Sequence, residues 1–148
     1  MPFALASPAF ESGQPIPALF SCAGENVSPP LAWQGAPPGT ASFVLIVEDP
    51  DAPAGTFRHW GVYDIPASVT SLPQGAAARL KSVRNDFGRS GYDGPCPPPG
   101  AAHHYHFRIV ALGRAELPLA GAADVASLWR AAAPYALGEA ELIGTFRR

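Results

Sequence analysis

Three stretches of the chain have the pattern of apolar and polar positions that is typical of β-strands. Ser42 to Glu48 is an almost unbroken apolar run, which favours a strand that is buried on both faces. Arg58 to Ile65 and His103 to Leu112 are rich in aromatic and β-branched residues, which strands prefer. Shorter strands are expected at three further places, namely Phe3 to Leu5, Leu31 to Trp33, and Glu139 to Phe146.

One segment near the C-terminus has helical periodicity. Its apolar residues recur at the spacing i, i+3, i+4, i+7, at Val125, Leu128, Trp129 and Ala132. Asp124 is a suitable N-cap because its carboxylate can accept from the free N–H groups of the first turn. Pro134 should end the helix. The pattern therefore predicts one short helix over residues 124–133.

Glycine and proline are frequent and are spread through the apolar segments without a repeat. The chain of 148 residues holds 18 prolines and 15 glycines. Proline interrupts helices and central strands alike, so short elements joined by tight turns are expected, as in an all-β protein. With 47% hydrophobic and 15% charged residues, residues 1–148 are long enough and apolar enough to form a single folded domain.

Charge and the apolar pattern exclude several classes of protein. The net charge is −2 and no run of basic residues exists, so nucleic acid is not an expected partner. No apolar stretch has the roughly 18 residues that a membrane-spanning helix needs, so no integral membrane contact is expected. Because Met1-Pro2-Phe3 does not begin a signal peptide, we expect a cytoplasmic protein in which Cys22 and Cys96 are free thiols. A strand-rich domain with few charges can pair through an apolar face, so a homodimer is a candidate state.

All four histidines lie on two of the expected strands. Successive side chains of a strand point to opposite faces, so His103 and Tyr105 share one face while His104 and His106 share the other. A pocket formed where strand ends meet loops would collect His103 and Tyr105 together with His59 from another strand. It would leave His104 and His106 outside.

Two acidic residues precede His59 in the segment Asp49-Pro50-Asp51-Ala52-Pro53. This segment must turn sharply if Asp49 is to reach His59 and join the same pocket. X–Pro bonds are the ones that adopt the cis form at low cost. We therefore expect at least one cis proline between Pro50 and Pro53 or between Pro95 and Pro99.

Two kinds of site are disfavoured by these positions. A metal site would use the His-x-His spacing and the carboxylates, but His104 and His106 face away from His103, so no metal or other cofactor is expected. A nucleophilic enzyme would use Cys96 or Ser90 with a histidine. The chain lacks a Gly-x-Ser-x-Gly motif, and the prolines around Cys96 cannot donate backbone N–H groups to an oxyanion.

A small anion pocket fits the residues better. Imidazoles, a phenol and backbone N–H groups can all donate hydrogen bonds to a phosphate or a carboxylate. The segment Gly91 to Gly100 suits such a pocket, because its glycines let a ligand approach the backbone and its prolines keep the loop rigid. The simpler interpretation, in which the histidines are ordinary strand residues, stays open at this point.

Several segments match, in order, the signature regions of a known family. The first is Asp49-Pro50-Asp51-Ala52-Pro53 followed by His59-Trp60. The second combines Gly91-Tyr92-Asp93-Gly94-Pro95-Cys96-Pro97-Pro98 with His103-His104-Tyr105-His106-Phe107. Ser28 to Trp33 is similar to the N-terminal block of that family, and Gly144 to Phe146 to its closing strand. Together these segments resemble the phosphatidylethanolamine-binding protein family, and most of all its bacterial and archaeal YbhB/YbcL branch, described as Raf kinase inhibitor-like proteins.

The resemblance implies a mainly β fold, an antiparallel β-sandwich with a small anion pocket at one end. The family's ligand-binding positions correspond to Asp49, His59, Pro97, Pro98, His103 and Tyr105, with Gly94 and Cys96 on the rim. Members of the family bind phosphate-bearing head groups or phosphorylated partners, and some inhibit kinases or proteases. We therefore expect a regulatory protein that binds a small anion or a phosphorylated ligand, with a protein kinase or a protease as a candidate partner. Asp64 stands where the family pattern has asparagine, a surface change that should leave the pocket intact.

A hydrolase that acts on a phosphate or acyl ester is the alternative function. His59 or His103 would be the acid–base group and Asp49 would orient it. The sequence lacks a convincing nucleophile, which favours binding over catalysis, and a turnover assay would separate the two.

Overall fold

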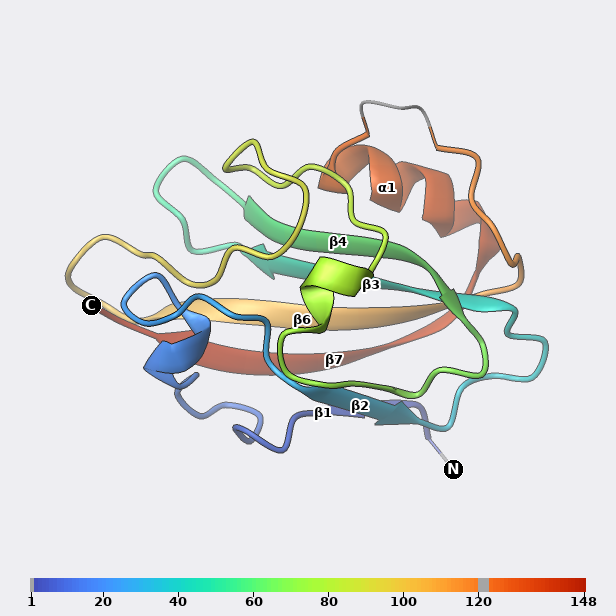
Figure 1. The fold of residues 1–148 in the computed structure, drawn as a ribbon, viewed down its shortest axis with the longest axis horizontal. Helices are drawn as coiled ribbons and strands as arrows, with labels where there is room; N and C mark the ends of the chain where they lie inside the picture. Colours follow the sequence, from blue (N-terminus) through green and yellow to red (C-terminus); the bar gives the residue numbers. More distant parts are fainter. Residues whose placement is uncertain (1, 120–122) are drawn as a thin grey trace.

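The computed structural model describes residues 2–119 and 123–148, which form two antiparallel β-sheets and one α-helix (Figure 1). The larger sheet consists, in spatial order, of β4 (Phe57–Pro66), β3 (Ser42–Asp49), β6 (His103–Leu112) and β7 (Ala136–Phe146). The smaller sheet consists of β1 (Ala4–Ala6), β2 (Leu31–Gln34) and β5 (Ser71–Leu72). Short 3₁₀ helices are found at η1 (Ala18–Phe20), η2 (Ala76–Arg79) and η3 (Ala133–Tyr135). The predicted mainly β fold is confirmed, and the three long strands occupy the segments expected from the sequence.

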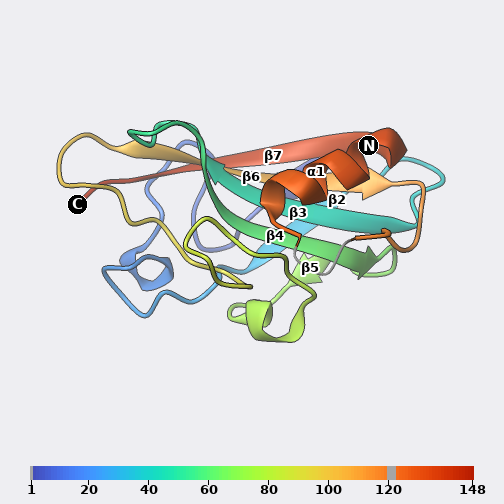
Figure 2. The ribbon, with the colours of Figure 1, turned by 90° about the horizontal axis from the view of Figure 1, so that it is seen from above.

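Strand β3 lies in the middle of the larger sheet and is buried on both faces, as its apolar run predicts. Phe43 and Leu45 point toward the smaller sheet and belong to the core between the two sheets. Val44 and Ile46 point the other way, into a second core under the α-helix. The small sheet, the large sheet and the helix therefore form three layers, and Figure 2 shows the helix in front of the large sheet.

The predicted α-helix, α1 (Val125–Ala132), is also confirmed. Asp124 caps it as expected, because its Oδ1 accepts from the backbone N–H of Ser127 at 2.9 Å. Gly61 of β4 lies beneath the helix, where a Cβ atom would come within 3.0 Å of Leu128, so this glycine lets the helix approach the sheet. No helix of the described residues is long and apolar enough to cross a membrane.

The predicted cis proline is wrong. The peptide bonds of Pro50 to Pro53 and of Pro95 to Pro99 are all trans. The turn after β3 is made by a side chain instead, because Oδ1 of Asp49 accepts from the backbone N–H of Asp51 at 2.8 Å. Such an Asx turn reverses the chain without a cis bond.

The predicted free thiols are also wrong. Cys22 and Cys96 form a disulfide, with their Cα atoms 5.3 Å apart although 74 positions separate them in the sequence. The two loops meet because the backbone N–H of Cys22 donates to the carbonyl oxygen of Pro95 at 3.0 Å, a contact that no local pattern reveals. Disulfides persist mainly in oxidising compartments. The bond therefore weighs against the expected cytoplasmic location, which stays a prediction.

Candidate functional site

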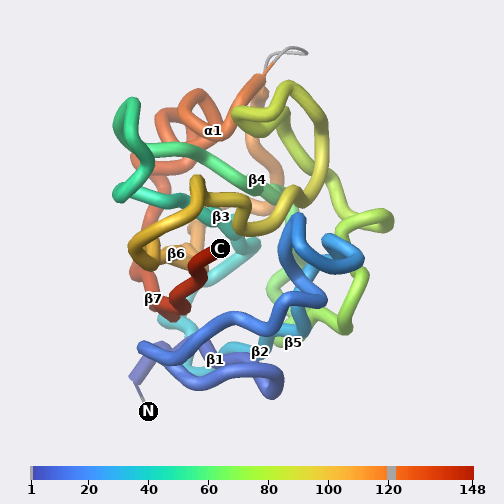
Figure 3. Tube along the Cα trace, turned by 90° about the vertical axis from the view of Figure 1, so that its left-hand side faces the viewer, coloured from blue at the N-terminus to red at the C-terminus, as the bar shows by residue number. Residues whose placement is uncertain are grey.

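One end of the larger sheet holds a cavity of about 130 Å³. It lies where β3 ends and where β4 and β6 begin, at the end of the sandwich that faces the viewer in Figure 3. The residues that line it are Asp49, Ala52, Pro53, Phe57, His59, Phe87, Cys96, Pro97, Pro98, His103 and Tyr105. Seven of the eight residues singled out in the sequence are therefore brought together around one cavity, and Gly94 is the exception.

Strand alternation sorts the histidines of β6 as the sequence predicts. His103 and Tyr105 line the cavity, whereas His104 and His106 lie on the opposite face of the strand. The Nδ1 atom of His104 pairs with Oδ2 of Asp51 at 2.8 Å. His106 pairs through its Nδ1 atom with Oε2 of Glu141 at 3.1 Å. Both outer histidines thus interact with surface carboxylates.

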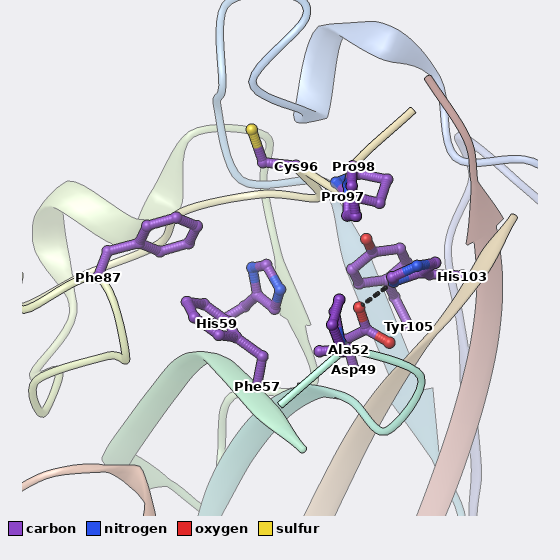
Figure 4. Close-up of a pocket in the computed structure, with 11 residues that line it drawn as sticks. Asp49, Ala52, Phe57, His59, Phe87, Cys96, Pro97, Pro98, His103 and Tyr105 are labelled. Atoms are coloured by element: carbon purple, nitrogen blue, oxygen red, sulfur yellow. Dashed lines mark hydrogen bonds and ion pairs between the residues drawn. The ribbon is translucent and has the colours of Figure 1, made fainter. Parts of the chain in front are cut away.

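Asp49, the last residue of β3, is buried and has both carboxylate oxygens engaged. Its Oδ2 is 2.7 Å from Nδ1 of His103, the pair marked by a dashed line in Figure 4. Its Oδ1 accepts from the backbone of Asp51. Because Nδ1 of His103 donates to a carboxylate, the other ring nitrogen of His103 carries a second proton whenever the imidazole is charged.

His59 is held by a different partner from the one expected. Its Nδ1 atom is 2.8 Å from the carbonyl oxygen of Asp93, whereas the sequence suggested that Asp49 would orient it. Burial lowers the pKa of the His59 imidazole. This effect of burial is larger than the opposing effects of the hydrogen bond and of the nearby carboxylates of Asp49, Asp93 and Asp86, which raise the pKa. His59 is therefore more readily neutral than a free histidine.

Tyr105 is 1% exposed, and its hydroxyl has no hydrogen-bond partner among the described residues. Its side chain points toward Pro97 and Pro98, with His103 beside it (Figure 4). Burial, and after it the negative charge of Asp49, raise the pKa of the Tyr105 hydroxyl well above its ordinary value. The group therefore stays protonated and is a hydrogen-bond donor without an acceptor.

A buried carboxylate that the sequence reasoning missed holds the loop beside the cavity. Asp93 accepts from Asn26 at 3.2 Å, from Asn85 at 2.8 Å and from the Arg89 guanidinium at 2.6 and 3.0 Å. Although burial by itself raises the pKa of this carboxyl, the hydrogen bonds from Arg89 and Asn85 outweigh it, and the pKa lies below its ordinary value. The same residue offers its backbone carbonyl to His59.

Gly94 shapes the loop without lining the cavity. Its backbone N–H donates to Oδ1 of Asn26 at 2.8 Å, and a Cβ atom at this position would collide with the carbonyl oxygen of Phe20. The carbonyl oxygen of Pro97 accepts from Nε of Arg148 at 2.7 Å. Pro97 is two positions after Pro95, which accepts from the backbone of Cys22. The rim is therefore held from two distant parts of the chain, residues 20–26 and the C-terminal Arg148.

Two aromatic residues of the lining were also missed by the sequence reasoning. Phe57 is two positions before His59 on the same strand, so alternation alone places both on one face. Phe87 is an apolar residue in an otherwise polar loop, and it is 40% exposed. Their ring centroids lie 4.8 Å apart, and together they cover one side of His59.

The chemistry that the lining offers is that of hydrogen bonding rather than of nucleophilic attack. The sulfur of Cys96 is engaged in the disulfide, and Ser90 does not belong to the lining. Among residues 2–119 and 123–148, no cluster of three or more His, Cys, Asp and Glu side chains is placed to hold a metal ion. What remains is a buried donor, two imidazoles and one carboxylate inside an apolar rim.

Comparisons with known proteins agree with the motifs. The family model described as phosphatidylethanolamine-binding protein matches residues 6–147. A UPF0098 protein of Aquifex aeolicus is 41% identical over 148 residues, which cover 96% of this chain and 86% of that protein. A UPF0098 protein of Methanothermobacter thermautotrophicus is 44% identical over 146 residues, 95% of each chain.

Solved structures give the same result. Escherichia coli YbcL, described as a member of the mammalian PEBP family, superposes with a TM-score of 0.93 at 34% identity, over 99% of this chain and 98% of that chain. The Chlamydia trachomatis protein CT736 has a TM-score of 0.91 at 38% identity, over 99% and 97% of the two chains. The chain therefore belongs to the phosphatidylethanolamine-binding protein family.

Proposed function

We propose that this protein is a binding protein for a small oxyanion, such as phosphate or the phosphate of a phosphorylated ligand. The observation that carries the proposal is the buried hydroxyl of Tyr105, which lines the cavity and has no acceptor among the described residues. An unpaired buried donor costs free energy in the unliganded protein. An anion in the cavity would supply the missing acceptor.

The Asp49–His103 pair makes the cavity compatible with negative charge. A bare carboxylate would repel an anion, but a protonated His103 balances Asp49, 2.7 Å away, and leaves its second N–H for the ligand. The pair can therefore accept an anion when the imidazole of His103 is protonated.

The size and lining of the cavity favour a small group on a larger ligand. A volume of about 130 Å³ is below the roughly 300–1,000 Å³ of sites for drug-sized molecules. The apolar rim of Phe57, Phe87 and Pro98 can contact what is attached to the anion. This supports a regulatory role in which the protein captures a phosphorylated head group or partner, with a kinase or protease as a candidate partner.

Hydrolysis of a phosphate or acyl ester is the second candidate, and the Asp49–His103 pair favours it. A carboxylate that orients an imidazole is a common arrangement for general-base catalysis. Among the described residues, the lining holds no serine or threonine hydroxyl, and the thiol of Cys96 is blocked. The attacking group would therefore have to be water. Release of product from phosphate and acyl esters at a rate that depends on His103 would favour the hydrolase over the binding protein.

Two buried tyrosines allow a controlled test of the binding function. The Tyr105 hydroxyl is unpaired, whereas the Tyr92 hydroxyl donates to the carbonyl oxygen of Phe20 at 2.6 Å. Calorimetric titration with phenyl phosphate should show that Tyr105→Phe weakens binding roughly 10- to 100-fold, because a hydrogen bond to a charged group is lost. Tyr92→Phe should leave the affinity unchanged.

Stability without ligand should move in the opposite sense. Tyr105→Phe removes an unsatisfied buried hydroxyl and should stabilise the free protein by about 1 kcal/mol, whereas Tyr92→Phe breaks a hydrogen bond and should destabilise it by about the same amount. Equal affinity of Tyr105→Phe and the unmodified protein for phenyl phosphate would contradict the proposal.

A further inference from the structure

The protonation pattern of His59 is set by the contact that orients its ring. A carbonyl oxygen can only accept, so the Nδ1 atom, 2.8 Å from the carbonyl oxygen of Asp93, must carry the proton. In the neutral imidazole the lone pair is then on Nε2. That atom has no hydrogen-bond partner among residues 2–119 and 123–148, and the ring lines the cavity. His59 thus presents an acceptor to whatever occupies the cavity.

Three aromatic rings keep water from His59. The centroid of its imidazole lies 5.0 Å from that of Phe57, 5.6 Å from that of Phe87 and 5.3 Å from that of Tyr105. The residue is 3% exposed. Of these rings, Phe87 is on a loop and is itself exposed, so it can be removed without opening the core.

The charged and titratable groups around His59 come from every element packed against it. They are Asp49 at the end of β3, His103 and Tyr105 on β6, and Asp86 and Asp93 in the loop before the rim. The carboxylates favour a charged imidazole, but burial has the larger effect and lowers the pKa of His59. The neutral acceptor form is therefore the one that meets the ligand near neutral pH.

We propose that the cavity selects an oxyanion that still carries a proton, namely the monoanion of a phosphomonoester, over an equally charged anion without one. The inference rests on the anion-binding function proposed above and names its ligand class. Two oxygens of the ligand accept from Tyr105 and His103, and its P–OH group donates to Nε2 of His59. A sulfate ester has no proton to donate, so one of its oxygens would face a lone pair in a desolvated site.

Three phenyl esters of similar size separate the possibilities. Phenyl phosphate carries an ionisable P–OH with a pKa of about 6, whereas phenyl sulfate and the diester methyl phenyl phosphate are monoanions without such a proton. The diester also represents the phosphate of a membrane lipid. Calorimetry should be done at about pH 6, with NMR of the His59 ring nitrogens on the same samples to show that the imidazole is neutral and protonated at Nδ1.

Phenyl phosphate should bind about tenfold more tightly than either proton-free ester at that pH. Its affinity relative to phenyl sulfate should fall as the pH rises to about 8, because the P–OH proton is lost. A site that responds to charge alone would show the opposite trend, since the phosphate becomes a dianion. The ratio to phenyl sulfate cancels the effects of protein groups that act on both esters alike, and the NMR measurement follows His59 separately.

Phe87→Ala should weaken this selectivity. The variant admits water to His59, raises the pKa of its imidazole and allows Nε2 to donate, so the phosphate-to-sulfate ratio should fall several-fold. Leu137→Ala is the matched control, because Leu137 is likewise an exposed large apolar residue, 46% exposed, and does not line the cavity. It should leave the ratio unchanged.

The outcomes distinguish anion binding itself from selection of a protonated anion. If none of the three esters binds, the anion-binding function itself is wrong. If all three bind with equal affinity, or if phenyl sulfate binds more tightly while His59 is neutral, the cavity binds anions but does not select the protonated one. A ratio that is the same in Phe87→Ala and in Leu137→Ala would overturn the role of Phe87.

Discussion

The cavity has two walls that are held in different ways. The strand wall consists of Asp49, His103 and Tyr105, which stand at the ends of β3 and β6 in the middle of the larger sheet. The loop wall is formed by the segments of residues 85–91 and 93–98, which carry Phe87 and the prolines of the rim. His59 is a strand residue whose ring is oriented by the loop wall, through the carbonyl of Asp93.

The two walls obtain their rigidity from different interactions. Backbone pairing fixes the strand wall, because Asp49 pairs with Phe57 of β4 and the segment from His103 to Tyr105 pairs with β7. The loop wall has no such ladder and depends on a few long-range contacts, namely the disulfide, the Asn26–Asp93 hydrogen bond and the contact of Arg148 with Pro97. If the protein binds an anion as proposed, we expect the strand wall to supply the affinity and the loop wall to set the selectivity, so that the loop wall can be loosened separately.

The largest expected effect comes from opening the loop wall at its covalent link. The double variant Cys22→Ser/Cys96→Ser should lose about 2 to 5 kcal/mol of unfolding free energy, because the bond closes a loop of 74 positions in the unfolded chain. Chemical denaturation with and without a dithiol reductant measures this. The reductant should lower the stability of the unmodified protein toward that of the double variant and leave the variant unaffected. Two reactive thiols in the unreduced, unfolded protein would contradict the disulfide.

Asp93 is the next point at which the loop wall can be broken. Asp93→Ala removes the acceptor of the Asn26 amide and one of the two acceptors of the Asn85 amide, and it should cost about 1 to 3 kcal/mol of unfolding free energy. The pKa of Asp93 lies below its ordinary value. Its carboxylate therefore stabilises the fold above about pH 4, and this contribution disappears as the pH falls through the pKa of the folded protein.

Denaturation curves between about pH 3 and pH 6 check the Asp93 prediction. The unmodified protein should lose more stability on acidification than Asp93→Ala does. Protonation removes the stabilising interactions of the Asp93 carboxylate, and the variant lacks this carboxylate already. Asp124→Ala is a useful control, since the pKa of Asp124 is also lowered, by its hydrogen bonds with Ser127. It should reduce the acid sensitivity without affecting the cavity. Parallel curves for Asp93→Ala and the unmodified protein would refute this account.

The same division explains how much of the site the sequence reveals. Period-2 alternation places His103 and Tyr105 on one face and needs only the bounds of β6, which are those expected from the sequence. The loop wall has no periodicity, and its contacts join Asp93 to Asn26 and Cys96 to Cys22 over 67 and 74 positions. Those contacts depend on how the loops pack against the finished sandwich. The free thiols were therefore expected wrongly, because Cys22 and Cys96 meet only in the packed loops. The cis proline was expected wrongly for a local reason, since the Asp49 side chain reverses the chain with trans bonds.

A third experiment compares the two histidines of the cavity. His103→Ala removes a donor of the strand wall and should weaken the binding of phenyl phosphate and phenyl sulfate alike, by roughly 10- to 100-fold. His59→Ala removes the acceptor and should weaken only phenyl phosphate. Calorimetric titration of both variants with each ester measures these losses. Identical losses of both ligands in both variants would show that the two walls do not have separate roles.

The smallest effect is expected outside the cavity, on the opposite face of β6. His104→Ala and His106→Ala should change anion affinity by less than about twofold, since each removes only an exposed pair with a carboxylate. His104→Ala is the more demanding test of the two, because His104 pairs with Asp51 and the backbone N–H of Asp51 donates to the cavity residue Asp49. The backbone N–H of residue 104 still donates to Asp51 at 2.8 Å after the substitution, so the turn that holds Asp49 should stay in place. A loss at His104 as large as that at His103 would mean that the outer face of β6 takes part in binding, and the division into two walls would then have to include it.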